Sequence, residues 1–214
     1  MKIAIVGAES TGKTVLAQQM TAHFQSRGHA AQLISEFLRA WCDREKRTPK
    51  ASEQAAIARE QAHRVDLARE TGHTIADTTP LMTAVYSDLL FNDTSLYDFA
   101  LQHQRRYDLT LLTALDLPWV ADGLQRDGPH VQPEVDRLLR LALGRAGINY
   151  HVVHGTGQQR LACALTIVEH FRQRLADQGA GRCAEWSWHC AQCGNAQCEH
   201  RLFKDLVGAG SMRR

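Results

Sequence analysis

Short apolar runs alternate with amphipathic stretches along most of the chain. Five of the runs have the length and composition of buried β-strands, and they cover residues 2–7, 30–35, 73–78, 107–115 and 149–155. Between them, apolar residues recur every three or four positions, as on one face of a helix, over residues 14–28, 52–70, 80–91, 96–106, 134–147 and 158–177. Strands that alternate with helices favour a parallel sheet covered on both faces. The pattern therefore predicts an α/β fold with a five-stranded parallel sheet flanked by helices.

The helical pattern stops near residues 177–182, which read DQGAGR. A chain of 214 residues can form one full α/β domain and a small appendage. We therefore expect a domain over residues 1–178 and a separate tail over residues 179–214, which holds four of the six cysteines.

Composition excludes some classes of protein. The formal net charge is +2, which demands neither nucleic acid nor a membrane surface as partner. The longest apolar runs fall far short of the ~20 residues of a membrane span, and the N-terminus has no signal-peptide layout. We expect a cytoplasmic protein that acts on a small molecule, with no membrane and no nucleic-acid partner; a homo-oligomer remains open.

The segment GAESTGKT, from Gly7 to Thr14, directly follows the first apolar run and opens a helix. It matches the P-loop pattern G-x-x-x-x-G-K-[ST] completely. The glycines let backbone N–H groups turn toward phosphate oxygens, and the helix N-terminus adds a favourable dipole. The pattern predicts binding of ATP or GTP with Mg²⁺. The residues expected at the nucleotide are Gly7, Glu9, Ser10, Thr11, Gly12, Lys13, Thr14 and Val15.

Two residues of this loop carry distinct chemistry. Lys13 is expected to reach the β- and γ-phosphates, and the hydroxyl of Thr14 is expected on Mg²⁺. Glu9 is unusual here because a carboxylate repels phosphates. It either points away from them or contacts another part of the site.

The other motifs favour a kinase among P-loop proteins. The Asn-Lys-x-Asp tetrapeptide of GTPases is absent from the sequence, and no apolar strand ends in the Asp-Glu pair of motor-type ATPases. A small-molecule kinase needs an acceptor site at strand ends, a carboxylate for the acceptor hydroxyl and a lid with cationic groups. The sequence offers candidates for each.

Glu36 follows the second predicted strand, so it should emerge at the sheet edge where ligands bind. It is the candidate base for the acceptor hydroxyl, and Arg39, one helical turn on, could pair with it or with a phosphate. The alternative for Glu36 is a solvated helix start.

Asp77 ends the third predicted strand and is placed to hold Mg²⁺. The alternative is a helix N-cap, which Thr78 or Thr79 could provide equally well. Thr83 and Tyr86, on the following helix, line the acceptor pocket or pack in the interior.

A segment rich in turn-forming residues, 116–128, follows the fourth strand and is the candidate lid. Arg126 would stabilise charge on the transferred phosphoryl group, Trp119 would stack on an acceptor base, and Asp122 is a further acceptor-side candidate. The alternative is an exposed loop over a structural tryptophan. After the fifth strand, Arg160 either stacks on adenine or is an ordinary arginine on a helix surface.

Together these motifs are similar to a known family. In order along the chain, GAESTGKT, SEFLR, ADTTPLMTAVY and YDLTLLTALDLPWVADGLQRDG resemble the ribosylnicotinamide kinase domain of the NadR family, over residues 1 to about 175. The resemblance implies a kinase that moves the γ-phosphate of ATP to the 5′-hydroxyl of nicotinamide riboside in NAD salvage. It implies ATP and Mg²⁺ at Lys13 and Thr14, acidic roles for Glu36 and Asp77, and a lid over residues 119–127.

The tail lies outside this resemblance and has metal-ligand spacing. Cysteines and histidines cluster there at short intervals, which suits a closed tetrahedral Zn²⁺ site. The candidate ligands are four among Cys183, Cys190, Cys193, Cys198 and His200. A redox dithiol and unpaired cysteines are the alternatives. A zinc tail would also fit a second function, an ATP-dependent switch that binds a partner through this module.

Overall fold

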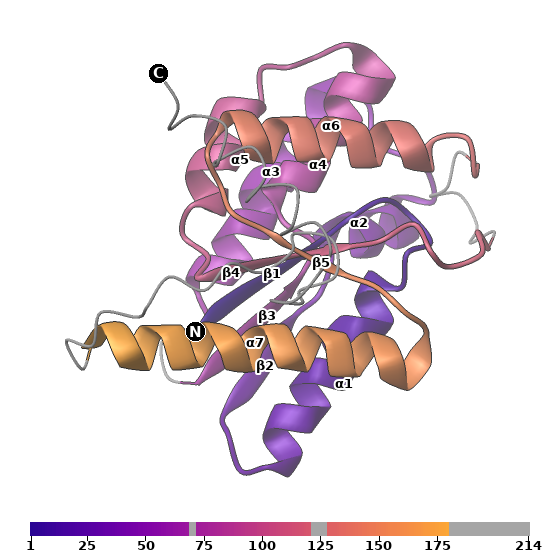
Figure 1. Cartoon of the computed structure of the whole chain (residues 1–214). Coiled ribbons are helices and arrows are strands. Elements are labelled where there is room, and N and C mark those ends of the chain that lie inside the picture. The colour runs from indigo at the N-terminus through magenta and orange to yellow at the C-terminus, as the bar shows by residue number, and fades with distance from the viewer. Residues whose placement is uncertain (69–71, 121–127, 180–214) are drawn as a thin grey trace, which may run out of the picture. The chain divides into compact units, whose positions relative to one another are not determined.

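The computed structural model describes residues 1–68, 72–120 and 128–179, and it confirms the predicted five-stranded parallel sheet (Figure 1). The strands are β1 (Lys2–Val6), β2 (Ala31–Ile34), β3 (His73–Asp77), β4 (Leu109–Thr113) and β5 (His151–Val153). Their spatial order is β2-β3-β1-β4-β5, and all neighbouring pairs are parallel. The C-terminal ends of the strands therefore meet at one edge, where open α/β sheets bind ligands.

The helices in the described residues are α1 (Lys13–Ser26), α2 (Phe37–Glu45), α3 (Ala51–Asp66), α4 (Pro80–Phe91), α5 (Tyr97–Gln104), α6 (Gln132–Arg145) and α7 (Gly157–Gly179). Each predicted helical range overlaps one of them. Helix α2 is additional, and the sequence raised it only as the alternative environment of Glu36. It is short, and it buries Trp41 and Cys42 beside Ile57 of α3. Its stability therefore depends on this packing more than on its own sequence.

Apolar side chains fill both faces of the sheet. On one face, Val6 of β1 and Leu112 of β4 pack in a cluster with α4, α5 and α6, which contribute Leu81, Ala100 and Val135 among others. Helix α1 packs on β1, β2 and β3 from the other face, which the first part of α7 also covers (Figure 1). Since β1 and β4 have neighbours on both faces, their residues are almost all buried. This explains why these strands read as continuous apolar runs.

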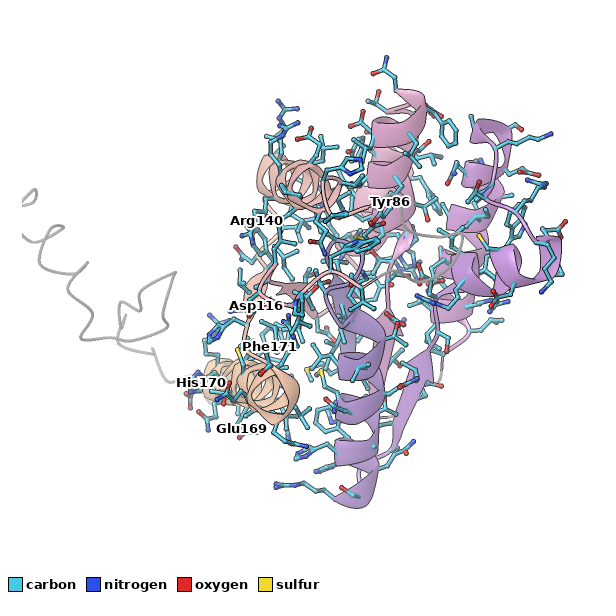
Figure 2. The ribbon with its side chains drawn as sticks, turned by 90° about the vertical axis from the view of Figure 1, so that its right-hand side faces the viewer. Tyr86, Asp116, Arg140, Glu169, His170 and Phe171 are labelled. Carbon is cyan, nitrogen blue, oxygen red and sulfur yellow. The ribbon has the colours of Figure 1, made fainter. Side chains whose placement is uncertain are left out.

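The chain divides into two compact units, Met1–Glu169 and His170–Arg214. Figure 2 labels Glu169, His170 and Phe171, where α7 passes from the first unit into the second. Every element of the sheet and of the site described below belongs to the first unit. In the parts of the chain that the structure describes, no helix is both long and apolar enough to cross a membrane.

Candidate functional site

The phosphate loop connects β1 to α1, as the sequence predicts. Gly7 has a φ of 147°, and a Cβ atom there would lie 2.1 Å from Oγ1 of Thr113 on β4. Gly12 has a φ of 76° and is the N-cap residue of α1. Both glycines are therefore required by the backbone: the first by a close approach and a left-handed conformation together, the second by its left-handed conformation.

Hydroxyl groups brace the loop against β4. Thr11 Oγ1 donates to the carbonyl oxygen of Ala8 at 2.7 Å and lies 2.6 Å from Thr113 Oγ1. The ammonium group of Lys13 donates to the same carbonyl at 2.7 Å. The cation thus lies against the loop that would hold the phosphates. The sequence did not identify Thr113, because it lies within a strand and its role depends on the register of β4 beside β1.

Asp77 lies at the end of β3 and is only 2% exposed. Burial raises the pKa of its carboxyl group, while the Thr14 hydroxyl and the charges of Lys13 and Arg39 act in the opposite direction. Its Oδ1 atom is buried without a hydrogen-bond partner. The N-cap alternative is wrong, since the N-cap residue of α4 is Thr79.

These residues fit the predicted Mg²⁺. A carboxylate oxygen without a donor beside a threonine hydroxyl offers the hard oxygen ligands that Mg²⁺ prefers, and Mg²⁺ usually takes only one or two protein ligands. The described residues hold no cluster of three or more His, Cys, Asp or Glu side chains that could hold a metal ion by themselves.

Replacing Asp77 with asparagine should stabilise the ligand-free protein. A raised pKa means that the folded state binds the proton more tightly than the unfolded state. The stability of the protonated form is therefore lost as the pH rises from the ordinary pKa of 3.8 through the raised value. D77N should avoid this loss, so its Tm at pH 8 should exceed that of the wild type by about 2–8 °C, and the gain should shrink toward pH 4.

With ATP and Mg²⁺ added, the order should reverse, since the wild type alone keeps the carboxylate ligand. Thermal unfolding with and without the nucleotide measures both effects. Asp43→Asn, on the exposed side of α2, is the control and should move neither Tm. Equal stabilisation of D77N and wild type by MgATP would contradict the assigned role of Asp77.

A cavity of about 680 Å³ lies beside the phosphate loop. Its walls come from the loop and the start of α1, from α2, α3 and α4, and from the segments that join them. The predicted site residues that line it are Glu9, Ser10, Thr11, Gly12, Lys13, Thr14, Val15, Glu36, Arg39, Thr83 and Tyr86. The predicted residues come from distant parts of the sequence, and they line the same cavity.

Glu36 and Arg39, at the start of α2, both line the cavity. Glu36 occupies the N-cap position of α2, and its Oε2 atom is 3.7 Å from Nε of Arg39. Both predictions for Glu36, a cavity carboxylate and a helix start, therefore describe the same position. Cys42 lies near them and also lines the cavity; burial, then the charges of Glu36 and Asp43, raise the pKa of its thiol. That thiol packs with Trp41 and Ile57.

Two glutamines of α3 are cavity residues that the sequence did not identify. Gln54 and Gln61 are each 3% exposed and line the cavity. Gln61 Oε1 accepts the backbone N–H of Phe37 at 2.7 Å, so it satisfies the first amide of α2. Glutamine on a polar helix reads as a solvent-exposed residue, and only the packing of α2 against α3 places these two side chains inside.

The side chain of Glu9 is hydrogen-bonded to the two ends of the segment that follows β4. Its Oε1 atom accepts the indole N–H of Trp119 at 3.2 Å and the backbone N–H of Gly128 at 3.3 Å. Next to it, Ser10 Oγ accepts the backbone N–H of Val120 at 2.8 Å. The indole N–H of Trp119 is thus bonded to Glu9, and the ring is not among the residues that line this cavity. Stacking of Trp119 on an acceptor base stays a prediction.

Of the two predictions for Arg160, the surface arginine is wrong, because its side chain is only 5% exposed. Stacking on adenine stays a prediction. The Arg160 guanidinium donates to the carbonyls of Val153 and Ala114 and to Asp116 at 2.5 Å. Asp116 also accepts the backbone N–H of Gly155 at 2.6 Å. Arg160 therefore joins the ends of β4 and β5.

Replacing Arg160 with methionine should destabilise the fold. The change leaves buried carbonyls and a carboxylate without their donor, which costs about 3 kcal/mol of the free energy of unfolding. Urea denaturation measures the loss. Arg137→Ala removes an arginine whose side chain is 58% exposed in its pair with Glu134, so it should leave the free energy of unfolding close to the wild-type value. Equal stability of R160M and wild type would show that the buried network is dispensable.

Some predicted residues lie outside the described part of the chain. These are Asp122 and Arg126 of the candidate lid and the proposed zinc ligands Cys183, Cys190, Cys193, Cys198 and His200. Their roles stay predictions.

A phosphate-binding loop on a five-stranded parallel sheet, beside a buried carboxylate and a cavity, defines a P-loop nucleotide-binding protein. Comparison with known families is more specific. The chain belongs to the AAA domain family, which matches it over residues 2–160.

It is 25% identical over 179 residues to the trifunctional NAD biosynthesis/regulator protein NadR of Salmonella typhimurium (strain LT2), which is 83% of this chain and 43% of that protein. A crystal structure of NadR protein in complex with NR superposes with a TM-score of 0.64 at 18% identity, over 79% of this chain and 50% of NadR. A deoxyadenosine kinase structure from M. mycoides gives 0.55 at 13% identity, over 79% of this chain and all of that chain.

The resemblance to NadR inferred from the sequence is thereby confirmed, and the fold is that of P-loop kinases. The chain spans about half the length, or less, of the NadR proteins that it matches.

Proposed function

We propose that this chain is an ATP-dependent nucleoside kinase, and that its acceptor is nicotinamide riboside. The observation that supports this most is the shared cavity. The phosphate loop, with Lys13, lines the same space as the carboxylate of Glu36 and the ring of Tyr86. A phosphate donor and an alcohol could therefore meet there, as phosphoryl transfer requires.

Each residue has a chemical task in this proposal. Lys13 binds the β- and γ-phosphates, and Glu36 accepts the proton of the acceptor hydroxyl as that oxygen forms its bond to the γ-phosphorus. The bond between the γ-phosphorus and the β–γ bridging oxygen breaks, and ADP leaves. Arg39 holds the Glu36 carboxylate in place. Mg²⁺ held by Thr14 and Asp77 would neutralise charge on the phosphates.

The walls that α3 and α4 contribute to the cavity favour a flat aromatic ring with an amide. Tyr86, which extends from α4 (Figure 2), lines it together with Ile57 and Phe91. Apolar and aromatic walls bind a ring, and the amide groups of Gln54 and Gln61 can pair with a carboxamide. Nicotinamide riboside has these features, and NR is the ligand in the superposed NadR structure.

An ADP-release assay with a panel of nucleosides tests the proposal. We expect turnover with ATP and Mg²⁺ only when a nucleoside is present, and fastest turnover with nicotinamide riboside. If only another nucleoside supports turnover, the proposed kinase activity would stand and the proposed acceptor, nicotinamide riboside, would be wrong. Slow ATP hydrolysis that no nucleoside changes would overturn the kinase and favour a nucleotide switch. Thermal shift with the same panel reports binding independently of turnover.

A further inference from the structure

The carboxyl group of Glu9 presents one oxygen for which the described residues supply no donor. Glu9 is 7% exposed and lines the cavity. Trp119 and Gly128 both donate to its Oε1 atom. Its Oε2 atom is buried and has no hydrogen-bond partner among the described residues. A buried carboxylate oxygen without a donor is costly, so a bound molecule that supplies the donor would gain what the protein lacks.

The group is also held in a fixed orientation. The two N–H donors fix Oε1, and the backbone carbonyl of Glu9 accepts Nε2 of Gln132 at 2.7 Å. The side chain is therefore anchored at its head and at its base. Such preorganisation lowers the entropy lost when a ligand donates to Oε2.

The chemistry of the missing partner can be narrowed. It must be an O–H or N–H donor, which excludes the phosphate chain of ATP, whose oxygens are acceptors and carry negative charge. Among O–H donors, the proposed reaction brings two to this loop, a hydroxyl of the acceptor and a water molecule on the metal. The metal position predicted at Thr14 and Asp77 already has its own carboxylate. Glu9 belongs to the loop that would hold the transferred phosphate, so the acceptor's sugar must come close to it.

We infer that Glu9 is a specificity-determining residue whose free carboxylate oxygen binds a second hydroxyl group of the acceptor sugar, one that is not phosphorylated. The inference rests on the proposed nucleoside kinase function. It implies that the enzyme distinguishes ribosides from deoxyribosides at the phosphate loop itself. A hydrogen bond from a hydroxyl to a charged oxygen contributes about 10–100-fold in binding or rate.

The test compares nicotinamide riboside with its 2′-deoxy and 3′-deoxy analogues in the wild type and in Glu9→Gln. The amide keeps Oε1 as acceptor for Trp119 and Gly128, and it replaces only the free oxygen with a donor. In the wild type, one deoxy analogue should lose about 10–100-fold in kcat/KM. In E9Q, the same deletion should cost less than threefold. Glu60→Gln, at an exposed carboxylate of α3 outside the cavity, should keep the full preference.

Each other outcome counts against a specific step. An unchanged hydroxyl preference in E9Q overturns the inference while leaving the kinase intact. A higher Mg²⁺ requirement in E9Q with the preference intact assigns Glu9 to metal-bound water, and this also overturns it. Wild-type protein that phosphorylates and binds no nucleoside, by ADP release and by thermal shift, overturns the proposed function and the inference together.

Discussion

Replacing Lys13 with alanine should lower nucleoside phosphorylation by about 10³-fold or more. The ammonium group now donates to the Ala8 carbonyl inside the phosphate loop, so a nucleotide would meet it without a large rearrangement. Its charge acts in a partly buried site, where it stabilises the developing charge on the phosphates more than water does. Steady-state kinetics with saturating nucleoside measures the loss, and the thermal shift caused by MgATP should fall in parallel.

Lys50→Ala is the matched control for this change. Lys50 is exposed just before α3, and its backbone N–H, which alanine retains, donates to Glu53 Oε2. The K50A variant should keep wild-type rates. If K13A retained a tenth of the wild-type rate, the loop would hold something other than a transferable phosphate.

The fold could be predicted from the sequence because its signals are local. The runs that became β1 and β4 are rich in buried apolar residues, and Gly12 stands where α1 begins. The positions of Glu36 and Asp77 followed from the same logic, since the end of a parallel strand marks the ligand-binding edge. Glu36 does line the cavity beside the phosphate loop, and Asp77 has a buried oxygen without a hydrogen-bond partner among the described residues.

The contacts that sequence reasoning missed all join distant segments of the chain. Gln61 enters the cavity because α2 packs on α3, and Arg160 is buried because two loops converge on it. Glu9 is bonded by residues more than a hundred positions away. A polar side chain has no periodic signature that distinguishes a buried, hydrogen-bonded site from solvent. Glu9 is the exception, because a carboxylate in a loop that binds phosphates is electrostatically unfavourable. The sequence alone therefore indicated an unusual role for Glu9.

Replacing Glu36 with glutamine should lower kcat by about 10²–10⁴-fold and leave the affinity for ATP nearly unchanged. The substitution keeps the size of the side chain and the start of α2, but an amide cannot take the proton of an acceptor hydroxyl. The KM for ATP should therefore stay close to the wild-type value, and the loss of kcat/KM at low pH that a titrating base produces should disappear.

Glu45→Gln makes the same chemical change at the other end of the same helix, where Glu45 pairs with Arg44 and lies outside the cavity. It should keep wild-type kinetics and so separates loss of the base from any change in α2. Pre-steady-state measurement of ADP formation would place the defect in the chemical step. A fully active E36Q would show that the acceptor hydroxyl needs no base from this helix, and that the carboxylate serves only the ion pair with Arg39.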